Sequence, residues 1–188
     1  DVCKKFLKDF AGTDYIIAPS ASCVGFVKNY YQKLFENSVN DAEVKALAAR
    51  TFELTDFLIN VLKVDDLGAT FEGKATYHDS CAALRECGLK EEPRKLLKNV
   101  KGLELVEMGD NETCCGFGGT FAVKFEPISI AMADQKITNA MATEAEYLIV
   151  KNLVTKTGQG GISLKIQEHL LKKSKKYINS FSSTHASP

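Results

Sequence analysis

The sequence lacks several features that would assign it to a functional class at once. It has no net charge, because 24 Lys and Arg residues balance 24 Asp and Glu residues. It also lacks the interleaved aromatic and basic residues that bind nucleic acid. No apolar run approaches the ~20 residues that a membrane-spanning helix needs. We therefore expect a protein that does not bind nucleic acid and does not span a membrane.

Signals for secretion are missing as well. Residues 1–5 open the chain without the basic and then apolar regions of a signal peptide. The absent initiator methionine leads us to expect that the chain starts inside a longer protein. The chain has 188 residues, enough for one domain or two small ones without disulfide staples. Its six cysteines fit a reducing cytoplasm, where thiols serve metal or redox chemistry more than structure.

The most informative feature present is the doublet Cys114-Cys115. Neighbouring cysteines are poor disulfide partners, because a bridge between them strains the disulfide geometry. Two thiolates on one tight turn are instead good soft ligands for zinc, copper(I) or an iron–sulfur cluster. A third cysteine, Cys81, follows the strand-like residues 74–77, so three cysteines lie near strand ends.

Glycines surround the doublet. Gly116, Gly118 and Gly119 allow positive φ angles and a close approach of the backbone to a bulky group. Successive amides in such a turn can point at an anion, including the sulfides of a cluster. The alternative is a plain turn with two buried small thiols. The stretch is not a phosphate-binding Walker loop, because it lacks the Gly-Lys-Ser/Thr ending.

Short apolar runs alternate with segments of helical periodicity along the chain. We expect strands at residues 15–18, 74–77, 103–106 and 147–150, a loop at 68–73, and helical segments at 2–10, 24–35, 41–62, 82–85, 93–97 and 127–141. This alternation predicts an α/β fold with a largely parallel sheet, in which function gathers at the carboxyl ends of the strands.

Three stretches together carry a resemblance to a known family. Residues 19–23, 78–81 and 114–124 are similar to the cysteine-rich CCG domain. This domain also occurs in heterodisulfide reductase, in the membrane-anchor component of anaerobic glycerol-3-phosphate dehydrogenase and in the iron–sulfur component of glycolate oxidase. Residues 55–62 and 92–97 resemble lactate utilization proteins of the A type most. The likeness runs from the N-terminus to about Val150.

The resemblance implies two copies of the domain, related by pseudo-twofold symmetry, each holding an iron–sulfur cluster. The implied cluster is of the 4Fe–4S type, in heterodisulfide reductase a noncubane form. Cys81, Cys114 and Cys115 match the lone cysteine and the doublet of the second copy, and Cys23 matches the final cysteine of the first. The implied arrangement is a truncated first copy with a linking helix at 1–70 and a second copy at 71–170. The basic and Ser-rich composition of residues 171–188 separately predicts a disordered tail.

The chain departs from the family pattern in two places. The lone cysteine and doublet of the first copy would lie before Asp1, and the final cysteine of the second copy would fall near Thr155, where there is none. Clusters usually take four thiolates. We therefore expect the cluster to be incomplete or absent in the chain as given.

Three functions remain open. The favoured one is an iron–sulfur subunit of an oxidoreductase that relays electrons as L-lactate is oxidised to pyruvate. Its partners would be companion iron–sulfur proteins of a lactate or glycolate oxidation complex. The second is a thiol–disulfide redox subunit similar to heterodisulfide reductase. The third is a zinc-binding or cluster-free scaffold.

Several other residues have simpler interpretations. Cys3 and Cys87 are expected to be structural thiols. His78 is expected to have a structural or supporting role, and Asp79 and Ser80 are expected to cap the turn that follows them. Arg85 and Lys124 flank the motif loops, where they either offset the charge of a cluster or are simply solvated.

Overall fold

The computed structural model describes residues 1–117 and 119–150, which form two compact units. Unit 1 contains residues 1–107 and the returning segment from residue 145, and unit 2 contains residues 108–144. The predictions for Gly118, for the missing ligand near Thr155 and for the tail at 171–188 lie outside the described residues. Among the helices that are described, none is long and apolar enough to cross a bilayer.

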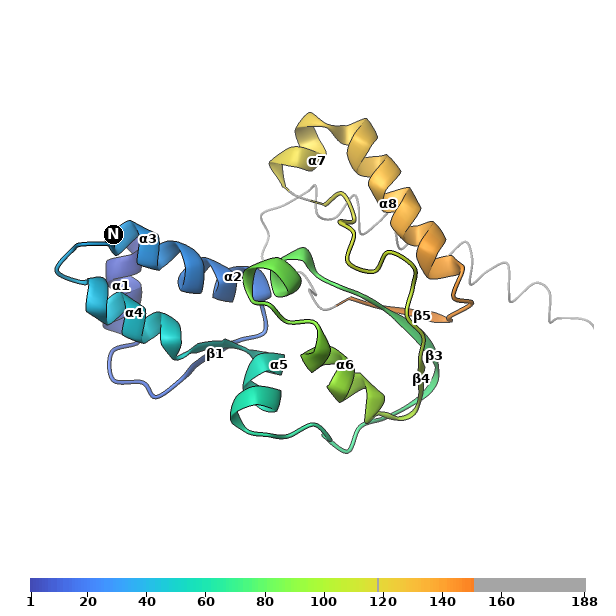
Figure 1. Cartoon of the computed structure of the whole chain (residues 1–188), viewed down its shortest axis with the longest axis horizontal. Helices are drawn as coiled ribbons and strands as arrows, with labels where there is room; N and C mark the ends of the chain where they lie inside the picture. Colours follow the sequence, from blue (N-terminus) through green and yellow to red (C-terminus); the bar gives the residue numbers. More distant parts are fainter. Residues whose placement is uncertain (118, 151–188) are drawn as a thin grey trace, which may run out of the picture. The chain divides into compact units, whose positions relative to one another are not determined.

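A three-stranded parallel sheet forms one part of unit 1 (Figure 1). Its central strand β3 (Thr70–His78) pairs with β4 (Lys101–Leu105) on one side and β5 (Tyr147–Val150) on the other. The expected parallel α/β class is confirmed. The expected loop at 68–73 was too long, because the ladder of β3 with β4 already starts at Thr70.

A second, two-stranded parallel sheet joins β1 (Ile16–Ala18) to β2 (Thr51–Glu53). The prediction of one helical stretch over 41–62 is wrong at this point. Helix α4 (Asp41–Ala49) ends before β2. After β2 come α5 (Leu54–Asp56) and η2 (Phe57–Val61). A strand of three residues is too short to show an alternating pattern, and its pairing with β1 supplies the stabilisation instead.

Helical segments complete unit 1. They are α1 (Val2–Asp9), the consecutive α2 (Ala21–Phe26), η1 (Val27–Tyr31) and α3 (Gln32–Phe35), then η3 (Ala82–Glu86) and α6 (Glu91–Lys98). The main apolar core gathers residues from α1, β1, η1 and α4: Cys3, Leu7, Ile16, Val27, Tyr31, Val44 and Leu47. Cys3 is only 5% exposed and lies within this core, in keeping with the expected structural thiol.

A smaller apolar cluster joins α2 to η3. It consists of Ala21, Ala83 and Leu89, with Ala82 and Cys87 packed against them. The Cys87 thiol lies 3.3 Å from the Ala21 carbonyl oxygen, in keeping with its structural interpretation. Small residues allow α2 and η3, which follow different strands, to pack closely.

Unit 2 consists of the loop from Met108, helix α7 (Thr120–Lys124) and helix α8 (Glu126–Met141). Pro127 stands in the first turn of α8, where its missing N–H and fixed φ angle suit a helix start. This helix is the longest described element, and it supports the cysteine doublet.

Candidate metal centre

The doublet Cys114-Cys115 lies in the loop of unit 2, with both side chains partly exposed. Directly after it, Gly116 is buried and has φ +82°. A Cβ atom on Gly116 would clash with the Ser129 carbonyl oxygen on α8. The turn therefore requires glycine for its conformation and for its close approach to the helix.

Two side chains of α8 brace this loop. The buried Ser129 hydroxyl donates to the Gly116 carbonyl oxygen at 2.8 Å. About two helical turns further on, Lys136 is only 5% exposed and donates to the Asp110 and Asn111 carbonyl oxygens at 2.6 and 3.0 Å. Loop carbonyls on both sides of the doublet are thus fixed to one rigid helix.

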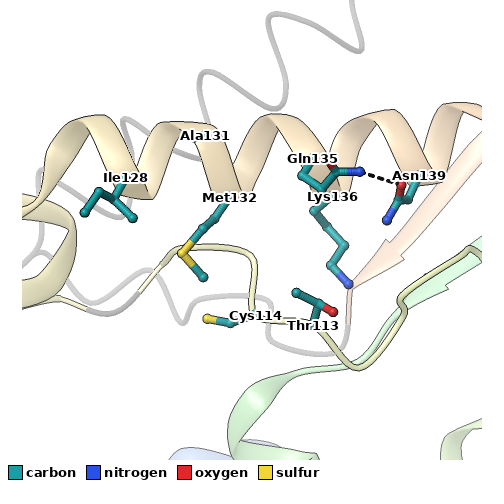
Figure 2. Close-up of a pocket in the computed structure, with 8 residues that line it drawn as sticks. All are labelled: Thr113, Cys114, Ile128, Ala131, Met132, Gln135, Lys136 and Asn139. Carbon is teal, nitrogen blue, oxygen red and sulfur yellow. Dashed lines mark hydrogen bonds between the residues drawn. The ribbon is translucent and has the colours of Figure 1, made fainter.

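A hollow of about 280 Å³ lies between the loop and α8. Figure 2 shows Met132 and Lys136 extending from the helix toward the loop that carries Cys114. The lining is mostly apolar and consists of Thr113, Cys114, Ile128, Ala131, Met132, Gln135, Lys136 and Asn139. One face of the Cys114 segment is therefore packed toward a largely apolar environment.

Gly119 directly precedes α7 and has φ +50°, so it also uses the freedom of glycine. Lys124 ends α7 and is exposed. Gly118 is outside the described residues.

Cys81 lies in unit 1, immediately after the end of β3. It precedes η3 and is half-buried, and the residues that lead to it from the strand's end, His78, Asp79 and Ser80, are all buried. The Ser80 carbonyl oxygen accepts from the Leu84 amide at 2.9 Å, which closes the first turn of η3. The position at a strand's carboxyl end is as the sequence predicted.

Asp79 does not cap this turn with its side chain, as had been expected. Its carboxylate instead receives two bonds from the Arg94 guanidinium of α6, at 2.9 and 2.7 Å. The same guanidinium donates to both Glu107 carboxylate oxygens at 2.6 and 2.9 Å, and to the Lys90 carbonyl oxygen at 2.7 Å. A buried carboxylate gains more from a charged bidentate partner than from a backbone amide.

This charge cluster perturbs the groups around it. The hydrogen bonds that Arg94 donates to Asp79 raise the pKa of Arg94 above its usual range, against the effect of burial. The Arg94 guanidinium also lies 5.3 Å from the centroid of the Tyr77 ring. Burial, followed by the negative charge of Asp79, raises the pKa of the Tyr77 hydroxyl.

Cys23 lies in α2, soon after β1, and is exposed. The Ser20 side chain caps this helix by accepting from the Cys23 amide at 3.4 Å, and its hydroxyl lies 3.3 Å from the Cys23 sulfur. The neighbouring Ser22 lines a hollow of about 390 Å³ together with Cys81 and Arg85. Within unit 1, the segments that carry Cys23 and Cys81 are thus brought to one surface region.

The donor set fits a thiophilic group in its chemistry. Each unit contributes soft thiol sulfurs at partly exposed positions, as zinc or an iron–sulfur cluster requires. Within either unit, however, the described residues place no three His, Cys, Asp or Glu side chains together as a metal site. The doublet offers two thiols on one turn, which is fewer than the four ligands that a structural zinc ion or an iron–sulfur cluster usually takes.

Comparison with known proteins assigns this arrangement to a class. Residues 75–153, which include Cys81 and the doublet, match the family of cysteine-rich domains called CCG. This stretch of the chain is therefore similar to the cysteine-rich domains of the CCG family.

Longer relatives narrow the assignment. The chain is 48% identical over 149 residues to lactate utilization protein A of Geobacillus kaustophilus and of Geobacillus thermodenitrificans. It is 46% identical over 146 residues to the protein of the same name from Lysinibacillus sphaericus. The matches cover 79%, 79% and 78% of this chain, but only 62%, 62% and 64% of the relatives. The chain is thus similar to lactate utilization protein A and spans less than two thirds of the length of these relatives.

Sequence reasoning found the cysteines but missed the side chains that support them. Ser129, Lys136 and the Arg94 cluster carry no motif, and their partners are 13 to 26 residues distant in the chain. The one available signal was helical spacing, because Ser129 and Lys136 are seven residues apart and so share a face of α8.

Proposed function

We propose that the chain is part of an iron–sulfur redox subunit that takes part in the oxidation of L-lactate to pyruvate. The observation that carries the proposal is a cysteine doublet held on a braced glycine turn, within a stretch similar to the cysteine-rich domains of the CCG family. The name of the relatives, lactate utilization protein A, supports the substrate. The partners would be companion iron–sulfur proteins of the same oxidation system.

In this proposal Cys81, Cys114 and Cys115 bind one iron–sulfur cluster, and Cys23 belongs to a second. A bound cluster would transfer one electron at a time. The two electrons that lactate releases would therefore pass through it singly. The chain's own residues hold the ligands: Ser129 and Lys136 fix the doublet loop, and the buried turn after β3 presents Cys81. The mainly apolar hollow beside Cys114 would limit the access of water.

The finer organisation also belongs to the proposal. The resemblance favours a duplicated domain with pseudo-twofold symmetry, with the boundary between the copies near residue 70. The cluster would be of the 4Fe–4S type. Because the matching position near Thr155 has no cysteine, this chain would bind its cluster incompletely.

A zinc-binding scaffold is the second candidate, and one observation favours it. The chain has no cysteine near Thr155 to serve as a fourth thiolate, and zinc accepts a water molecule in place of a fourth protein ligand.

Anaerobic reconstitution with iron and sulfide tests the proposal. The chain itself should take up little iron, whereas Thr155→Cys should raise the content of iron and sulfide several-fold and give brown visible absorption. Val154→Cys and Lys156→Cys test whether the missing ligand position lies one residue earlier or later. Thr138→Cys, on the exposed face of α8, is the matched control and should not raise the iron content.

Single substitutions then identify the ligands. In the Thr155→Cys background, Cys81→Ser, Cys114→Ser and Cys115→Ser should each abolish the visible absorption, and Cys87→Ser should leave it intact. Preferential binding of zinc by the purified chain, without uptake of iron by any variant, would exclude the redox subunit and support the scaffold.

A further inference from the structure

Arg94 makes more hydrogen bonds than the neutralisation of its charge requires, since one carboxylate would be enough for that. A guanidinium has five N–H donors. All five have an acceptor here: four bonds go to the carboxylates of Asp79 and Glu107, and the fifth goes to the Lys90 carbonyl oxygen. The Tyr77 ring lies against the guanidinium as well. Such a fork fixes its partners in direction as well as in distance.

The two carboxylates mark two strand ends. Asp79 follows β3 directly, and only the buried Ser80 separates it from Cys81. Glu107 comes two residues after β4 and is the last residue of unit 1 before the chain enters unit 2, which carries the doublet. Arg94 therefore links the turn that presents Cys81 to the point where the doublet segment begins.

We infer that Arg94 is a positioning residue for the metal centre, acting through Asp79 on the turn of Cys81 and through Glu107 on the start of the doublet segment. This role rests on the proposed function of Cys81 as a ligand. The burial of the ion pair supports it, since the Arg94 and Asp79 side chains are only 5% and 2% exposed. A buried ion pair is weak evidence for a contribution to overall stability. Because this pair lies beside the turn of Cys81, we assign it the role of fixing the local geometry of that turn.

Lysine is the informative replacement, because Arg94→Lys keeps the charge but cannot form two bidentate pairs. In the apo chain, alkylation by iodoacetamide at fixed pH, measured for each cysteine by mass spectrometry, reports the mobility of each turn. Cys23 is exposed, is bonded to Ser20 at the start of its own helix and serves as an internal reference. Arg94→Lys should raise the Cys81/Cys23 rate ratio by about fivefold, the effect of losing one hydrogen bond.

Two further variants make the test specific. Lys95→Met removes a positive charge from the exposed face of the same helix and should leave the ratio unchanged. If Arg94→Lys does not fold, Glu107→Gln serves instead, because the Glu107 side chain is 43% exposed and a charge lost at an exposed position costs less than one lost in the interior. It should raise the ratio by about twofold, since one of the two anchors is weakened.

A merely structural arginine would give a different result. Global destabilisation would also speed alkylation of the buried Cys3 in the main core, so a rise at Cys81 that Cys3 matches would overturn the inference. An unchanged Cys81/Cys23 ratio in Arg94→Lys would overturn it as well. In the reconstituted Thr155→Cys protein, Arg94→Lys should also alter the electron paramagnetic resonance spectrum of the cluster. If no variant binds iron, the proposed function fails, while the alkylation ratio still decides the role of Arg94.

Discussion

At Gly116 one residue sets the shape of the doublet turn. Its φ of +82° is costly for any residue with a side chain, and a Cβ atom would meet the backbone of α8. The Ser129 hydroxyl then fixes the carbonyl oxygen of the same glycine. Conformation, packing and hydrogen bonding therefore act on one position next to the two thiols.

We predict that Gly116→Ala lowers the free energy of unfolding by about 2 kcal/mol, because strain in φ adds to the clash with α8. Urea unfolding followed by circular dichroism measures this loss. Gly109→Ala is the matched control, because its Cβ would meet no atom within 4 Å and the site has no positive φ. Equal stability of the two variants would contradict the account of the turn.

Ser129→Ala should cost about 1 kcal/mol, because the Gly116 carbonyl oxygen loses its buried donor. The loosened turn should also speed alkylation of Cys114 and Cys115 relative to Cys23. Ser38→Ala, in an exposed loop of unit 1, is a suitable control. Unchanged alkylation rates would show that the hydroxyl does not restrain the doublet.

At the scale of elements, α2 and η3 depend on a small residue for their packing. A Cβ on Gly25 of α2 would lie 2.5 Å from the Cβ of Glu86 in η3. Asn29, one turn further on, donates to the backbone carbonyl and the carboxylate of Glu86 at 2.9 and 3.0 Å. The contact holds the segments of Cys23 and Cys81 against each other within unit 1.

Gly25→Ala should therefore destabilise the protein by about 1–3 kcal/mol, the usual cost of overpacking, although alanine is the better helix former. Thermal unfolding measures the change, and Gly109→Ala again provides the comparison. A stabilised Gly25→Ala variant would mean that η3 can move away from α2 at no cost.

At the scale of the whole molecule, the main core places a thiol among apolar side chains. Burial raises the pKa of Cys3, and the charge of the N-terminus opposes this only in part. A raised pKa in the folded state means that stability is fully present below the ordinary thiol pKa of about 8.5 and is lost as the pH rises above it.

We predict that the free energy of unfolding of the protein falls as the pH rises above about 8.5, and that Cys3→Val removes part of this fall. Urea unfolding at a series of pH values from about 7 to about 10 gives the comparison. Cys23→Ser, at an exposed position, should leave the slope unchanged. Identical slopes for Cys3→Val and the unmodified chain would show that the thiol does not titrate on unfolding.

The sequence by itself determined the class of fold and singled out the cysteines that we propose as ligands. Periodicity located β5 at Tyr147–Val150 and the long helix that begins beside Pro127, because these patterns are local. The cysteine doublet and its glycines were readable for the same reason. β2 was missed, because a three-residue strand is stabilised by a partner 35 residues away in the chain.

Only the tertiary structure decided how the thiols are supported. Asp79 was expected to cap a turn, yet it binds Arg94, which lies 15 residues further along the chain and becomes its neighbour only when α6 packs beside the sheet. Ser129 and Lys136 likewise act on the doublet loop across a fold of the chain. Ligand identity depends on side-chain chemistry, which sequence carries directly, whereas positioning depends on distances that arise only once distant segments are packed.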